Sequence, residues 1–141
     1  MSKTAAALAT FAFGAAIALA GPASADKMKA TLDGKSEVPA NTSAATGSAD
    51  IDYDAASKKL SWKLTYSGLS GPTTAAHFHG PAEPGKNAGV MIPITNATSS
   101  PADGSATLTE AQATELMAGK MYINVHTAAN PGGEIRGQVM K

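Results

Sequence analysis

The sequence predicts an all-β fold, an antiparallel β-sandwich of the Greek-key or immunoglobulin-like kind with about eight strands and one short helix. Short runs of alternating apolar and polar residues recur along most of the chain. Clusters of Gly, Pro, Asn, Asp and Ser separate these runs, and only one segment carries the start and stop signals of a helix. Many short strands with regularly spaced turns are typical of a β-sandwich.

The clearest β-hairpin is expected at residues 121–139, where an Asn-Pro-Gly-Gly turn joins two alternating runs. In the first run the two faces are formed by Ile123 and Val125 against Tyr122, Asn124 and His126. In the second run they are formed by Ile135 and Val139 against Glu134, Arg136 and Gln138. Because successive side chains of a strand point to opposite faces, the hairpin presents an apolar face for a core and a decorated polar face.

Six further strands are expected at residues 26–33, 48–53, 60–67, 73–79 and 90–94 and in a short segment that ends at residue 108. The run at 60–67 alternates most regularly, with Trp62 on its apolar face and Lys63 on the other. Trp62 is expected at the centre of the core, because no other side chain offers so much apolar area. Pro93 has no backbone N–H, so the run at 90–94 is expected at an edge or a bulge.

A short helix is expected after Thr109. Thr109 and Gln112 have the spacing of a capping box, good helix formers continue to residue 118, and Gly119 suits the left-handed C-terminal cap. Leu116 and Met117 are expected to dock this helix on the sandwich.

The first 25 residues have the form of a secretory signal peptide. Lys3 supplies a positive start, residues 5–20 are small and apolar, and Ala23-Ser24-Ala25 has the A-x-A form of a cleavage site. The apolar run is short for a membrane span and lacks a stop-transfer flank; a short N-terminal anchor is the alternative. Residues 26–141 are then the mature domain, which is expected to be periplasmic or secreted and to have no integral membrane span.

The charge balance and the lack of cysteine exclude several classes of function. The first 25 residues hold one of the 11 basic side chains and none of the 11 acidic ones, so the mature domain is close to neutral. A neutral domain has no electrostatic footprint for nucleic acid or an anionic membrane. Without cysteine there is no disulfide, no thiolate metal site and no lipid attached to a cysteine after the signal. The expected partner is an unidentified protein or small ligand.

All three histidines of the chain fall in two of the predicted strands. His77 and His79 point to one face, roughly 6–7 Å apart along their strand, which is close enough to converge on one ion. His126 lies on the polar face of the hairpin, with Glu134 across from it. The three histidines predict a site for one copper or zinc ion, with Glu134 or water as the fourth ligand. Imidazole ligands suit Cu(II) or Zn(II), while a blue-copper site is excluded because it requires a cysteine.

A purely structural interpretation of the same residues stays open. Histidines on a strand can hydrogen-bond loop carbonyls and so hold a turn such as Gly80-Pro81. Glu134 and Arg136 can form a cross-strand surface pair, which contributes little to stability. The domain would then be a structural or adhesive β-sandwich that uses its polar face for protein or glycan contacts.

No catalytic residue and no bound organic cofactor are predicted. The chain has no Gly-x-Ser-x-Gly elbow, and no evident base stands beside its serines. We therefore expect a binding protein and not an enzyme.

Five segments resemble the CHRD domain, both in their residues and in their order along the chain. This family is named after the animal protein chordin and is also found in small exported bacterial proteins. The segments are residues 32–39 (LDGKSEVP), 76–82 (AHFHGPA), 108–112 (LTEAQ), 118–127 (AGKMYINVHT) and 130–138 (NPGGEIRGQ). A small departure is Ala40, where the family often has a second proline. The resemblance covers nearly all of the expected mature chain and implies an exported β-sandwich module, without implying a defined activity.

Cleavage after Ala25 is expected to leave a mature protein that begins at Asp26, because signal peptidases cut after the last alanine of an A-x-A site. Intact-mass measurement of protein recovered from the periplasm or the medium checks this. A full-length chain retained in the membrane would contradict it and would favour the anchor.

Overall fold

The computed structural model describes residues 14–15 and 24–141. The expected signal peptide therefore lies almost entirely outside the described residues. The first strand begins at Asp26, directly after the expected cleavage site.

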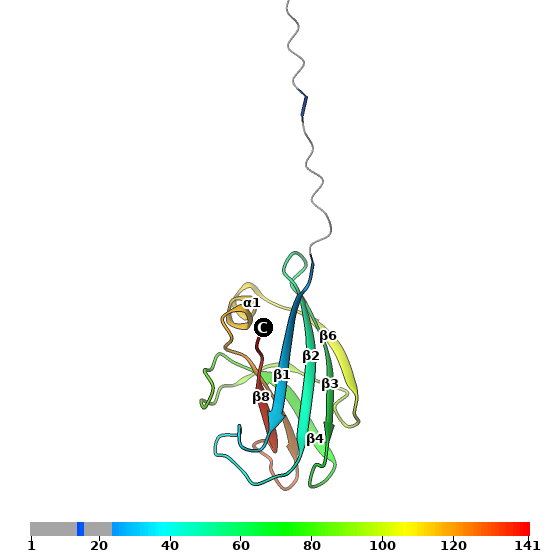
Figure 1. Cartoon of the computed structure of the whole chain (residues 1–141), viewed down its shortest axis with the longest axis vertical. Helices are drawn as coiled ribbons and strands as arrows, with labels where there is room; N and C mark the ends of the chain where they lie inside the picture. The colour runs from blue at the N-terminus through cyan, green and yellow to red at the C-terminus, as the bar shows by residue number, and fades with distance from the viewer. Residues whose placement is uncertain (1–13, 16–23) are drawn as a thin grey trace, which may run out of the picture.

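Within residues 24–141 the chain forms eight strands and one helix (Figure 1). In chain order these are β1 (Asp26–Asp33), β2 (Thr46–Asp54), β3 (Lys59–Ser67), β4 (Thr73–His79), β5 (Val90–Pro93), β6 (Ala102–Thr107), α1 (Glu110–Met117), β7 (Tyr122–Thr127) and β8 (Ile135–Gln138). Each of the eight strands expected from the alternation is present, with ends that differ by a few residues.

The strands form one antiparallel sheet in the order β5-β4-β7-β8-β1-β2-β3-β6. Strands β3 and β4 lie near opposite ends of this order, yet the ring centroids of Trp62 on β3 and Phe78 on β4 are 5.0 Å apart. The sheet therefore folds over until its two halves face each other, as the layers of a sandwich that approaches a barrel (Figure 1). The predicted all-β antiparallel sandwich is confirmed, and β5 with Pro93 lies at an edge as expected.

The core fills the space between the two halves of the sheet. Leu60, Trp62 and Leu64 are buried on β3, and only 7% of Trp62 is exposed. Gly104 on the neighbouring strand β6 leaves room for the indole, since a Cβ at that position would overlap the ring. The expectation that Trp62 belongs to the core is confirmed.

The helix has the caps that the sequence predicts. Thr109 and Gln112 exchange both hydrogen bonds of the capping box, and Gly119 has a φ of +74° just beyond the C-terminal end. Leu116 is buried, and Ala113 also packs against the core, but Met117 is 41% exposed. The expectation for Met117 is wrong because its side chain lies toward solvent. No helix in the described part of the chain is long and apolar enough to cross a membrane.

The polar face of the β7–β8 hairpin is buried, which differs from the open decorated face expected from the sequence. All six residues of β7 are buried. The loop at residues 80–89 covers one part of this face: Ala88 N–H donates to the Tyr122 hydroxyl (3.1 Å), and Arg136 Nη1 donates to Asn87 Oδ1 (3.0 Å). The loop at residues 128–134 covers another part. We call these two segments the covering loops.

Glu134 is fully buried and joins the β7–β8 turn to two other loops. Its carboxylate accepts hydrogen bonds from Ser43 Oγ, from Ser70 N and Oγ, from Thr127 Oγ1 and from Asn130 Nδ2. Burial by itself raises the pKa of Glu134, but the hydrogen bonds from Ser70, Thr127 and Ser43 outweigh it and lower the pKa to about 2. A buried polar network in which every acceptor has donors rigidifies the segments that it connects.

Replacing Trp62 with alanine is expected to lower the free energy of unfolding by about 3–5 kcal/mol, because loss of the large side chain leaves a cavity between the two halves of the sheet. Lys63→Ala, one residue away on the exposed face, is expected to stay within about 0.5 kcal/mol of the natural protein. Urea unfolding of both variants checks this, and equal midpoints would contradict the assignment of faces.

Glu134→Gln is expected to destabilise the domain by about 2 kcal/mol, because a neutral amide cannot accept from all the donors that the carboxylate satisfies. Since the pKa of Glu134 is lowered to about 2, its stabilising contribution is complete above the unfolded value of 4.5 and is lost as the pH falls toward 2. The difference in urea midpoint between Glu134→Gln and the natural protein should therefore shrink over this window. Glu83→Gln, at an exposed carboxylate, is the matched control. A pH-independent difference would contradict the prediction.

Candidate metal site

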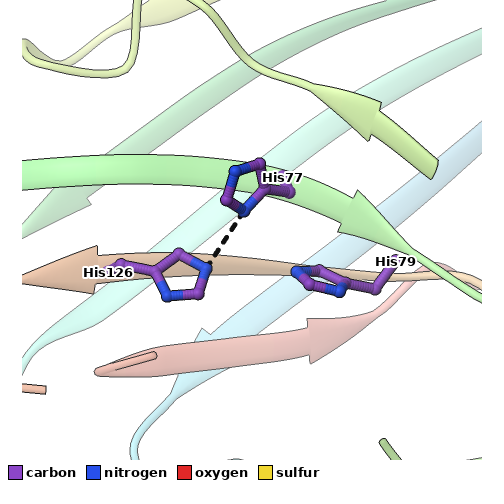
Figure 2. Close-up of side chains that lie close together, drawn as sticks. All are labelled: His77, His79 and His126. Atoms are coloured by element: carbon purple, nitrogen blue, oxygen red, sulfur yellow. Dashed lines mark hydrogen bonds between the residues drawn. The ribbon is translucent and has the colours of Figure 1, made fainter. Parts of the chain in front are cut away.

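The three histidines lie side by side on β4 and β7 (Figure 2). His77 and His79 point to the same face of β4, and His126 lies on the neighbouring strand β7. The ring centroids are 4.9 Å apart for His77 and His126, 5.4 Å for His77 and His79, and 6.1 Å for His79 and His126. One nitrogen of each ring lies within 4.8 Å of one nitrogen of the other two. The structure thus brings together the three histidines that the sequence singles out.

Backbone carbonyls decide which ring nitrogen carries the hydrogen in two of the histidines. His79 Nδ1 lies 2.9 Å from the carbonyl oxygen of Ala88, and His126 Nδ1 lies 2.9 Å from that of Pro131. A carbonyl oxygen only accepts, so each Nδ1 carries a hydrogen and each Nε2 of the neutral rings has a free lone pair. Metal-binding histidines almost always donate their other ring N–H to a carboxylate, a backbone carbonyl or water.

The ring of His77 contacts the ring of His126. His77 Nδ1 lies 3.1 Å from His126 Nε2, the contact drawn as a dashed line in Figure 2. Since His126 Nε2 is an acceptor, His77 Nδ1 is the donor in the metal-free protein. In contrast, Nε2 of His79 is buried and has no hydrogen-bond partner among the described residues. A buried acceptor without a partner costs free energy and needs an explanation.

Burial favours the neutral form of His77 and His79. It lowers the pKa of His77, and the nearby His126 and His79 lower it further. Burial also lowers the pKa of His79 and outweighs the hydrogen bond to Ala88, which acts in the opposite direction. The neutral imidazole is the form that binds a metal ion.

Sequence reasoning missed the residues that hold His79 in place. The Tyr122 ring is stacked on the His79 ring, with centroids 4.9 Å apart and planes at 2°. The guanidinium of Arg136 lies 3.5 Å from the centroid of the same tyrosine ring. The alternation of β7 indicated that Tyr122 belongs near the histidines, because it places Tyr122 on the face that carries His126.

The structure does not bring Glu134 to the histidines. Glu134 does not belong to the group of ligand atoms within 4.8 Å, and both of its oxygens accept hydrogen bonds from other residues. Its partner Thr127 follows His126 on β7 and so points to the opposite face. Glu134 and Arg136 do not form the alternative surface pair either, since both side chains are buried and Arg136 bonds to a covering loop.

Comparison with known protein families agrees with the motifs in the sequence. The family model of the CHRD domain matches residues 28–139, a span that contains the three histidines and nearly the whole sheet. The comparisons with curated proteins and with solved structures found no match. Because the family model covers most of the chain, the protein belongs to the CHRD-domain family.

Proposed function

We propose that this CHRD domain is an exported binding protein that holds one Cu(II) or Zn(II) ion through His77, His79 and His126. The observation that carries the proposal is the state of the ring nitrogens. Carbonyl groups hold the Nδ1–H of His79 and His126, so each ring has its lone pair on Nε2. The lone pair of His79 has no partner among the described residues, and that of His126 faces His77 Nδ1 at 3.1 Å. Three neutral imidazoles without a thiolate form a ligand set that copper and zinc accept.

The distances support a single ion. Zinc–nitrogen bonds of about 2.0–2.1 Å place two ligand nitrogens of a tetrahedral ion roughly 3.3 Å apart. His77 Nδ1 and His126 Nε2 are separated by 3.1 Å, and one nitrogen of each of the three rings lies within 4.8 Å of one nitrogen of the other two. When His77 binds through Nδ1, its hydrogen moves to Nε2 of the same ring. Small rotations of the side chains would complete the shell.

The proposed role is binding, with no catalytic residue assigned. The signal-like N-terminal segment supports export to the periplasm or the medium, where the domain would take up the ion or pass it to a partner. A metal held by the folded domain would also add stability to a chain without disulfides.

A structural role for the histidines is the second candidate, and specific contacts favour it as well. The hydrogen bonds from His79 to Ala88 and from His126 to Pro131 hold both covering loops against the sheet. An adhesive role for the polar face has less support, because the covering loops bury that face on β7. If the role is structural, metal ions have no effect and each histidine substitution destabilises the metal-free protein.

Calorimetric titration of the metal-free mature protein with zinc or Cu(II) is expected to show one ion bound per chain. His126→Ala should weaken binding by more than the roughly 10–100-fold lost with an outer-shell partner, because it removes a ligand. Saturating metal should raise the melting temperature of the natural protein and not that of His126→Ala. Lys63→Ala, on β3, serves as a control and should bind as the natural protein does. Absence of one-to-one binding in the natural protein would rule out the site.

Metal affinity is expected to fall as the pH drops below the ordinary histidine value of 6.5, because protons compete with the ion for the imidazoles. Burial lowers the pKa of both His77 and His79, so the loss should begin at a lower pH than for exposed histidines. Titrations between about pH 5 and pH 8 measure this dependence. An affinity that is constant over this range would argue against imidazole ligands.

A further inference from the structure

Asn124 lies at the centre of the histidine cluster because of its place in the sheet. It is paired with His77 across β4 and β7, and it precedes His126 by two residues on the same face. His79 is paired with Tyr122, the preceding residue on that face, so Asn124 is the diagonal neighbour of His79. Opposite and diagonal positions on one face of a sheet bring side chains within reach of each other. Only 3% of Asn124 is exposed.

Two buried acceptor atoms at this point have no partner. Asn124 Oδ1 and His79 Nε2 both lack a hydrogen bond within the part of the chain that the structure describes. His79 has its hydrogen on Nδ1, where it is donated to Ala88, so Nε2 does not supply a donor. The two atoms belong to diagonal neighbours on one face of the sheet. Two buried acceptors without partners need a donor or a cation.

The surroundings of Asn124 decide which end of its amide faces the cluster. Nδ2 donates to the carbonyl oxygen of Gly132 at 3.4 Å. Nδ2 and the buried carboxyl of Glu37 both border the space beside Gly133, where an added Cβ would overlap Asn124 Nδ2 and Glu37 Oε1. With acceptors on the Nδ2 side, the oxygen is the end of the amide that remains for the histidines.

From these contacts we propose that Asn124 Oδ1 is the fourth protein ligand of the ion, in the place that the sequence suggested for Glu134 or water. This inference rests on the proposed three-histidine site. It gives a set of three nitrogens and one oxygen, which Cu(II) and Zn(II) both accept. The Gly132 carbonyl then acts as a positioning group, because it accepts from the amide nitrogen and so keeps the oxygen on the metal side.

The affinity test compares zinc titrations of the natural protein, Asn124→Ala and Asn96→Ala. Asn124→Ala is expected to weaken zinc binding by at least the roughly 10–100-fold that is lost with an outer-shell partner, because it removes a ligand. Asn96 is the matched control, because its side chain is exposed and donates to the Asp103 carbonyl outside the cluster. Asn96→Ala should bind as the natural protein does, and urea midpoints of the metal-free variants check that both are folded.

A second readout uses the natural protein and does not depend on the folding of a variant. Copper(II) is bound in water enriched in oxygen-17, which broadens the electron paramagnetic resonance signal when water is a strong equatorial ligand. The natural protein should show no such broadening, because Asn124 holds the fourth position, and Asn124→Ala should gain it. On zinc binding, the side-chain ¹⁵N–H signals of Asn124 should also shift.

The outcomes separate the two proposals. If the natural protein binds an ion but shows equatorial water, and Asn124→Ala binds as tightly, water is the fourth ligand and the inference fails while the three-histidine site stands. If the natural protein binds neither zinc nor Cu(II), both proposals fail. Weaker binding by Asn124→Ala, together with water entry in that variant alone, supports Asn124 as a ligand.

Discussion

The antiparallel register between β4 and β7 is the constraint on which the rest of the structure depends. Because side chains alternate along both strands, this register sends Phe78 and Val125 into the core and turns His77 and His126 to the other face. A slip of one residue would exchange the two sets and place imidazoles among apolar side chains. The contact of Phe78 with Trp62 across the folded sheet therefore also sets the position of the histidines on either side of Phe78.

The covering loops turn an ordinary polar face into a buried one. Once these loops lie over β7 and β8, every polar atom beneath them requires a partner, since water no longer supplies one. Glu134 meets this requirement with donors from three segments of the chain, and its contribution is structural. Asn124 Oδ1 and His79 Nε2 do not meet it with atoms of the described residues. Polar atoms that a natural protein leaves without partners tend to mark functional sites. We therefore propose a structural role for Glu134 and a role in binding for Asn124 and His79.

The same hydrogen bonds connect the cluster to the covering loops. His79 bonds to the carbonyl of Ala88 in one loop, and His126 bonds to the carbonyl of Pro131 in the other. An ion bound by these rings would strengthen their N–H donors and so hold both loops more firmly on the sheet. Metal binding would then be coupled to closure of the covering loops. The proposed metal-binding role and the structural role of the histidines use the same hydrogen bonds.

Much of the fold and part of the site follow from the sequence alone. Period-two alternation located the strands, placed Trp62 in the core, and put His77 and His79 on one face, because strand geometry is a local property. Alternation did not predict the direction of the Glu134 side chain, because Glu134 lies outside β8 and follows Gly133, which has a φ of +124°. The contact of His77 with His126 joins residues 49 positions apart, and Asn124 matters only beneath the covering loops. The tertiary structure decided these features, since folding of loops over a sheet depends on contacts between distant segments that no local pattern records.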